Sequence, residues 1–172
     1  YVNQVGRIPY WTDGIVFRDA NYGYDDEQGH GEKFLAWLRA DKSHHLGVIA
    51  YDDRRIRIDG KLVVGPTGGT YRKTQRMVER LGRDVELKHT QADRYERFTG
   101  LDGQLELTLV NNRDDAILHT VLVEKNGLIH GLTFGTPWAG KAGEFFADRA
   151  YDRWIQRSEE HTSALQSRQV IS

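Results

Sequence analysis

The chain has 172 residues, of which 38% are hydrophobic and 28% are charged, a balance typical of a soluble globular domain with a hydrophobic core. Its 24 basic and 25 acidic residues nearly cancel, so no overall field attracts nucleic acid or an anionic membrane, and we expect no nucleic-acid partner. The absence of cysteine excludes disulfides, thiolate metal ligands and cysteine nucleophiles, and it leaves the compartment open. No apolar run approaches the roughly 20 residues of a transmembrane segment, and no signal peptide opens the given chain, so we expect a soluble protein.

The first half of the chain predicts strands and helices in alternation. Residues 13–19 read as a short strand, and residues 22–31 as a polar loop. Apolar residues at helical spacing predict a helix over 31–42, and the apolar run after it predicts a buried strand over 46–52.

Two local signals follow this strand. Asp59 and Gly60 predict the turn of a β-hairpin. The stripe of Thr74, Met77, Val78 and Leu81 predicts a second helix over 70–82, with Thr70 as its cap and Gly82 at its end.

The second half predicts antiparallel structure. Residues 104–110 alternate between apolar and polar side chains, as in a half-buried antiparallel strand. Residues 116–134 predict a hairpin closed by Asn126 and Gly127, which would hold His119 and His130 roughly 13 Å apart, too far for one zinc ion. Aromatic residues at helical spacing predict a closing helix over 143–156.

The run from the strand at 104 to the closing helix at 156 resembles the end of the PsbP and Mog1 type of domain. This resemblance implies an α/β/α sandwich that serves in accessory and partner-binding roles. The expected fold class is therefore α+β, with a mostly antiparallel sheet flanked by three helices.

The last residues have a different character. The stretch RSEEHTSALQSR, residues 157–168, resembles the translation of a sequencing adapter, which suggests a metagenomic gene fragment. We expect a single domain over residues 1–157 and a disordered, non-native tail over 158–172.

The stretch HHLGVIAYDDRR, residues 44–55, is the first candidate site. Adjacent side chains on a strand point to opposite faces, so Asp52 and Asp53 can cooperate only if the strand has ended before them. They follow the apolar run directly and would lie at its carboxyl end, where α/β sheets place their ligands.

Residues 13–53 resemble part of a phosphatase of the haloacid-dehalogenase type, with DGIVF as a strand, GHGEKFLAWL as a helix and GVIAYDD ending in the acidic pair. The resemblance implies magnesium bound by Asp52 and Asp53, with Lys33 or His30 in place of the family's lysine. The nucleophilic Asp-x-Asp strand of that family is absent from the chain, and the antiparallel second half does not belong to its fold.

A second candidate is an anion site at the start of the helix predicted over 70–82. Backbone N–H groups of Gly68, Gly69 and Thr70 could hold an anion, with Arg72 and Lys73 supplying charge. The alternative is an ordinary capped helix start.

Two functions remain open. The leading one is a non-catalytic accessory domain, without metal or cofactor, that binds a protein partner or small ligand on the open face of its sheet. Aromatic residues are the candidates for contact with that partner, namely Tyr10, Trp11, Tyr22, Tyr24 and Trp138. The alternative is a magnesium-dependent phosphohydrolase, truncated at its N-terminus, with Asp52, Asp53, Lys33 and His30 as its site.

Overall fold

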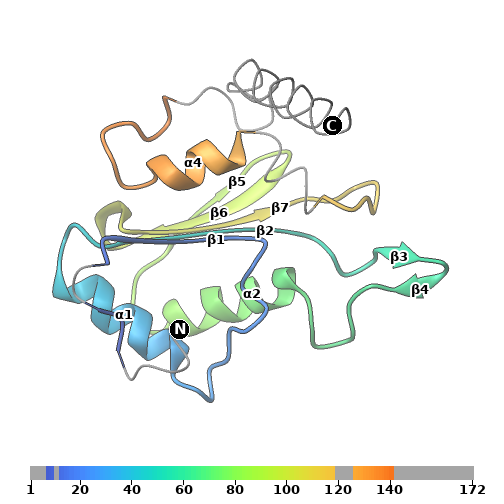
Figure 1. Cartoon of the computed structure of the whole chain (residues 1–172), viewed down its shortest axis with the longest axis horizontal. Coiled ribbons are helices and arrows are strands. Elements are labelled where there is room, and N and C mark those ends of the chain that lie inside the picture. The colour runs from blue at the N-terminus through green and yellow to red at the C-terminus, as the bar shows by residue number, and fades with distance from the viewer. Residues whose placement is uncertain (1–6, 10–11, 119–125, 142–172) are drawn as a thin grey trace, which may run out of the picture.

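A computed structural model describes residues 7–9, 12–118 and 126–141 of the chain (Figure 1). Five strands of these residues form one sheet in the order β1-β2-β7-β6-β5, and β3 and β4 form a separate hairpin. The strands are β1 (Gly14–Arg18), β2 (His45–Tyr51), β3 (Arg57–Ile58), β4 (Lys61–Leu62), β5 (Lys88–Gln91), β6 (Tyr95–Gly100) and β7 (Leu105–Val110).

The sheet is mixed, which corrects the expectation of a mostly antiparallel sheet. β1, β2 and β7 are mutually parallel, with Leu46 opposite Leu105, whereas β6 and β5 are antiparallel to their neighbours. The alternation of residues 105–110 is common to both kinds of pairing, so it does not reveal that β7 lies parallel to β2.

Helices cover both faces of the sheet. α1 (His30–Ala40) and α2 (Thr70–Leu81) lie on one face, and α4 (Gly127–Thr133) lies on the other (Figure 1). The described residues therefore form an α+β fold with α/β/α layers. The main core lies under α1 and α2, where Leu38, Leu46, Met77, Leu105 and Leu107 are fully buried.

The prediction of a hairpin over residues 116–134 is wrong for its second strand. Residues 127–133 form α4, and the Asn126 carbonyl accepts a hydrogen bond from the His130 N–H. Gly131 allows this helix to approach β1, because a Cβ at Gly131 would lie 3.1 Å from the side chain of Val16. Packing against the sheet thus overrides the local Asn-Gly turn signal. The expected separation of His119 and His130 was derived from that hairpin, so it no longer applies.

Most of the other elements predicted for the described residues are confirmed. The strands at 13–19, 46–52 and 104–110, the helices at 31–42 and 70–82, and the Asp59-Gly60 hairpin are all present within two residues of their predicted ends. β5 and β6 have no counterpart in the prediction. The predicted helix over 143–156 and the tail over 158–172 lie outside the described residues.

α2 begins differently from the prediction. Its N-cap residue is Gly69, and the first-turn N–H of Thr70 donates to the carboxylate of Asp53, which comes from the end of β2. No helix among the described residues is long and apolar enough to cross a membrane.

Candidate functional site

Three polar segments meet at one edge of the sheet, because the parallel strands β1, β2 and β7 all end there. β1 is followed by Asp19, β2 by Asp52 and Asp53, and β7 by Asn111 and Asn112. Backbone hydrogen bonds keep the strand ends in line, from the Asp19 N–H to the Ile49 carbonyl and from the Asp52 N–H to the Val110 carbonyl. Sheets of this kind bind ligands at the carboxyl ends of their strands.

Asp19 and Asp53 are brought together by Thr70. The Thr70 hydroxyl donates to Asp19 Oδ1, and the Thr70 backbone N–H donates to Asp53 Oδ2 at 2.8 Å. The two carboxyl groups are buried, with exposed fractions of 2% and 4%. Asp53 Oδ1 is buried and has no hydrogen-bond partner among the described residues.

Burial is the main reason why the pKa of Asp53 is raised, and the negative charge of Asp19 raises it further. The pKa of Tyr51 is raised to about 12, again mainly by burial, with Asp19 and Asp53 contributing. The pKa of Tyr22 is raised by burial and by the same two carboxylates. The raised pKa values favour the neutral forms of Asp53, Tyr51 and Tyr22.

Most donors of the predicted anion site bind groups within the protein, including the Gly68 N–H, which donates to the Gly65 carbonyl. The Thr70 N–H binds Asp53, and a Cβ added at Gly69 would lie 2.6 Å from the oxygens of that carboxylate. Arg72 donates to the carbonyls of Gly65 and Gly68, and Lys73 Nζ donates to the Tyr24 carbonyl at 2.6 Å. The protein's own carboxylate thus lies where an external anion would bind, and anion binding there stays a prediction.

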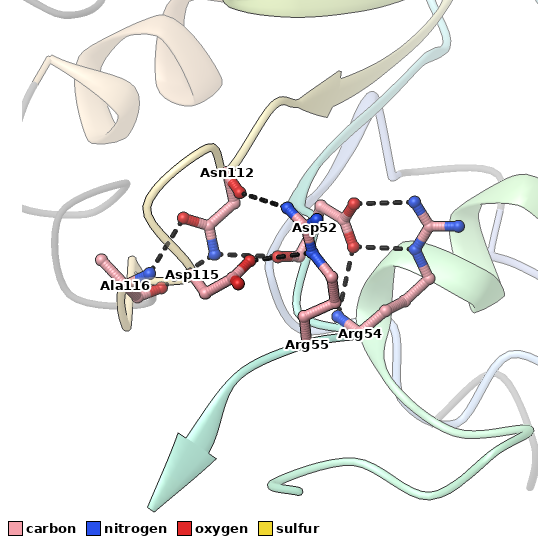
Figure 2. Close-up of polar contacts among 6 residues, drawn as sticks. All are labelled: Asp52, Arg54, Arg55, Asn112, Asp115 and Ala116. Carbon is pink, nitrogen blue, oxygen red and sulfur yellow. Dashed lines mark hydrogen bonds and ion pairs between the residues drawn. The ribbon is translucent and has the colours of Figure 1, made fainter.

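The Asp52 carboxylate points towards Arg54 (Figure 2). Its two carboxylate oxygens accept from Arg54 Nε at 2.8 Å and Arg54 Nη2 at 2.7 Å. Its backbone carbonyl accepts from Asn112 Nδ2, and neighbouring Arg55 forms an ion pair with Asp115 (Figure 2). The two adjacent aspartates therefore belong to different networks.

Lys33 and His30 have their contacts elsewhere. Lys33 lines a hollow along α1 together with Arg7 and Trp37, whereas His30 Nδ1 accepts a hydrogen bond from the Asp25 N–H. Asp52, Asp53 and His30 thus each have a different hydrogen-bond partner. The oxygens best placed for a cation come from Asp19, Asp53 and Thr70, although the described residues contain no cluster of three or more His, Cys, Asp or Glu residues that could hold a metal ion.

A pocket of about 380 Å³, which we call the β1–α1 pocket, lies next to this edge between β1, α1 and α2. Its volume falls within the range of about 300–1,000 Å³ that is usual for small-molecule sites. Its floor is mainly apolar, and exposed Ala20 and Gly23 lie at its rim. The residues that define it are Ile15, Phe17, Asn21, His30, Phe34 and Met77.

The second face of the sheet carries a smaller hollow of about 200 Å³ between β2, β7, β6 and α4. It is lined by apolar Val16, Ile49 and Val110 together with Thr108 and Arg97. From the sequence we expected an open sheet face for a partner or ligand. α4 covers part of this face and is held by a hydrogen bond from Arg18 Nη1 to the Leu128 carbonyl.

The predicted contact aromatics divide into three groups. Tyr22 and Trp138 are exposed, by 55% and 67%. Tyr24 was expected to contact a partner at the surface, but it is buried, and its hydroxyl donates to Asp26 Oδ1. Tyr10 and Trp11 lie outside the described residues.

Asp19 and Asn21 are not among the site residues predicted from the sequence. The signal was present for Asp19, because it is the last residue of the strand predicted over 13–19, just as Asp52 is the last residue of the strand predicted over 46–52. To predict that Asp19 and Asp53 both bind Thr70, one would have to know that β1 and β2 are parallel neighbours.

Comparison with known proteins adds no family to these observations. No protein-family model, no curated protein and no solved structure matches the chain. Function is therefore argued from the geometry of the pocket and of the strand ends alone.

Proposed function

We propose that this protein is a non-catalytic domain that binds a small, largely apolar molecule in the β1–α1 pocket. The observation that carries the proposal is a pocket of about 380 Å³ whose floor is formed by deeply buried apolar side chains of α1 and α2. Mainly apolar pockets of this size, with a few polar groups and residues of shifted pKa, are the usual form of a small-molecule site.

The pocket lies beside the carboxyl edge of the parallel strands. Asn21 lines the pocket and follows Asp19 by two residues, and its amide donates to Thr74 Oγ1 on α2 at 2.9 Å. The buried hydrogen bonds at the strand ends thus continue into the pocket wall. Such a wall is held in one arrangement before a ligand arrives, which reduces the entropy cost of binding.

Met77 provides a direct test, because it is the chain's single methionine, is fully buried and lines the pocket. A protein labelled at the methionine methyl should therefore give one pocket signal in a carbon-edited NMR spectrum. We expect toluene to shift this signal in a saturable manner. A signal that does not move up to the solubility limit of toluene would contradict the proposal.

A pair of glycine variants provides the control. Gly23 lines the pocket and Gly65 lies on an exposed loop, and a Cβ added at either position would have no heavy atom within 4 Å. Gly23→Leu places bulk at the rim and should weaken toluene binding, whereas Gly65→Leu should leave the titration unchanged. Equal titrations of the two variants, with the Met77 signal still shifting, would locate toluene elsewhere.

A second candidate function is the magnesium-dependent phosphohydrolase. The observation in its favour is that Asp19 and Asp53 lie at the ends of neighbouring parallel strands and both accept hydrogen bonds from Thr70. Magnesium is commonly held by one or two carboxylates together with water and a substrate phosphate. In this alternative the metal pair would be Asp19 and Asp53, in place of Asp52 and Asp53.

Magnesium titration separates the two functions. A bound metal stabilises the folded state by mass action, so a phosphohydrolase should show a rise in melting temperature at millimolar magnesium. We expect no rise and no phosphate release from an aryl phosphate. A magnesium-dependent rise that both Asp19→Asn and Asp53→Asn abolish, while Asp52→Asn retains it, would favour the enzyme.

A further inference from the structure

The β3–β4 hairpin lies in a strongly basic part of the chain. Residues 54–76 include seven basic side chains and one acidic side chain, that of Asp59, although the whole chain has a net charge of -1. Arg57 and Lys61, on either side of the turn, are exposed. Arg57 donates to the Gly60 carbonyl, and neither cation forms an ion pair with a described residue. The hairpin therefore presents positive charge that the protein itself does not neutralise.

The same hairpin exposes three large aliphatic side chains. Ile58, Leu62 and Val63 are exposed by 52%, 49% and 50%. Such residues are usually buried, and several of them close together on a surface commonly mark an interaction site. The hairpin projects from the body of the molecule (Figure 1). An isolated two-stranded hairpin is only marginally stable in water, so burial of these side chains against a partner would stabilise it.

The register places a cation beside an aliphatic residue on each face of the hairpin. Ile58 is opposite Lys61, and Arg57 is opposite Leu62. Opposite residues share a face, whereas successive residues alternate between faces. The long stems of lysine and arginine can lie along an apolar surface while their charged ends reach a more polar layer. Each face thus combines apolar contact with positive charge.

We propose that the β3–β4 hairpin is an arm that binds the protein to the surface of an anionic lipid membrane. Peripheral binding of this kind needs burial of apolar side chains among the lipid headgroups and attraction of basic side chains to negative lipids. The three aliphatic residues supply the first, and Arg57 and Lys61 supply the second. This proposal does not depend on a ligand in the β1–α1 pocket.

Other anionic partners match the arm less well. A nucleic acid is bound mainly through its phosphates, so its binding would depend on the two cations and little on aliphatic side chains spread over both faces. An acidic protein would have to provide an apolar groove that matches both faces of a projecting hairpin. A fluid headgroup layer adapts to such an arm without a preformed groove.

Sedimentation with lipid vesicles tests the proposal on the full chain. We expect binding to vesicles of equal parts phosphatidylglycerol and phosphatidylcholine, and little binding to phosphatidylcholine alone. Raising the salt concentration should weaken the binding, because salt screens the attraction between charges. Failure to sediment with the anionic vesicles at low salt would overturn the proposal, and so would equal sedimentation with both kinds of vesicle.

Variants of the charged residues locate the attraction. Arg57→Gln and Lys61→Gln should each weaken binding to the anionic vesicles by about fivefold, which corresponds to about 1 kcal/mol for each basic residue near a negative membrane. Asp59→Asn should strengthen binding, because it removes the negative charge of the turn. Arg83→Gln changes an exposed arginine after the end of α2 and should keep the wild-type affinity. Equal losses for Arg57→Gln and Arg83→Gln would show that total charge, and not the arm, attracts the protein.

Variants of the aliphatic residues separate a membrane from other polyanions. Ile58→Ser and Leu62→Ser should each weaken binding to the anionic vesicles by at least about threefold, because less apolar surface is buried. Leu132→Ser is the matched control on α4, at a position that is 71% exposed. All three side chains are exposed, so an almost unchanged melting temperature should show that each variant is folded. If the serine variants of the arm bind vesicles and immobilised heparin as tightly as the wild-type protein, the arm binds polyanions by charge alone and the proposal is overturned.

Discussion

At the scale of single residues, Asp53 illustrates how burial changes the role of a side chain. The sequence places it after a strand, where an aspartate is commonly exposed and loosely paired. In the structure Asp53 is buried near Asp19, and its Oδ2 accepts a hydrogen bond from the Thr70 N–H in the first turn of α2. Its carboxylate therefore supports the helix start while carrying an electrostatic cost.

The sign of that cost follows from the pKa of Asp53, which is raised above the ordinary value of 3.8. A carboxyl group with a raised pKa binds its proton more tightly in the folded state. Its ionised form therefore destabilises the fold at neutral pH, and this penalty disappears as the pH falls through the folded pKa towards 3.8. We expect Asp53→Asn to be at least as stable as the wild-type protein at pH 7, with a smaller difference at pH 4, measured by urea unfolding.

Asp53→Ala provides the contrast. Alanine removes the acceptor of the buried Thr70 N–H as well as the charge, so we expect a loss of about 1–3 kcal/mol in the free energy of unfolding. If Asn and Ala have equal effects at pH 7, the hydrogen bond to Thr70 contributes nothing to the stability of α2.

At the scale of elements, the start of α2 depends on a glycine. Gly69 has a φ of 90°, and its missing side chain leaves room for the Asp53 carboxylate. The loop from 65 to 69 and the end of β2 could not come so close if residue 69 carried a Cβ.

Gly69→Ala should therefore destabilise the protein more than Gly60→Ala. Both positions have positive φ, at 90° and 76°, so each substitution strains the backbone, and at Gly69 the ψ of 155° lies in a region that almost only glycine adopts, with a cost of about 1–3 kcal/mol. Only at Gly69 would the added Cβ also meet a carboxylate, at 2.6 Å, whereas Gly60 has open space. Urea unfolding of both variants measures the difference. Equal losses would mean that Asp53 moves aside at no cost.

α4 shows how tertiary packing selects an element. Residues 127–133 follow a strong hairpin signal, yet Gly131 lies against β1 and Arg18 holds the Leu128 carbonyl. We infer that contact with the sheet, and not local propensity, stabilises this short helix.

Gly131→Val should weaken the packing of α4 on β1. The branched side chain would enter a space in which a Cβ already lies 3.1 Å from Val16 and 3.3 Å from Arg18. We expect faster hydrogen exchange at the His130 amide and unchanged exchange in β7. Leu132→Val also introduces a valine into α4, at a position that is 71% exposed, and should have little effect. Unchanged exchange in Gly131→Val would show that α4 does not depend on this contact.

At the scale of the whole molecule, the main core joins elements from both halves of the chain. Leu38 of α1 is fully buried in the cluster that includes Leu46 of β2, Met77 of α2 and Leu107 of β7. The order of the sheet places β7 beside β2, so the first half of the chain cannot complete this core alone.

Leu38→Ala should cost about 2–5 kcal/mol in the free energy of unfolding, because it leaves a cavity where four elements meet. Leu62→Ala, on the separate β3–β4 hairpin and about half exposed, should change it by no more than about 0.5 kcal/mol. Similar losses for the two variants would contradict the assignment of the core.

The sequence by itself determined the α+β class and the elements whose signals are local. Periodicity placed α1 and α2, apolar runs placed β1, β2 and β7, and Asp59-Gly60 placed the small hairpin, because each of these signals is produced by residues within one segment. Only the tertiary structure decided the parallel pairing of β1, β2 and β7, the helical state of 127–133 and the meeting of Asp19 with Asp53. Pairing partners and burial depend on contacts between distant segments, and alternation along one strand is the same for a parallel and an antiparallel neighbour. The β1–α1 pocket belongs to this second group, because Asn21 and His30 come to one wall only after β1, α1 and α2 have packed together.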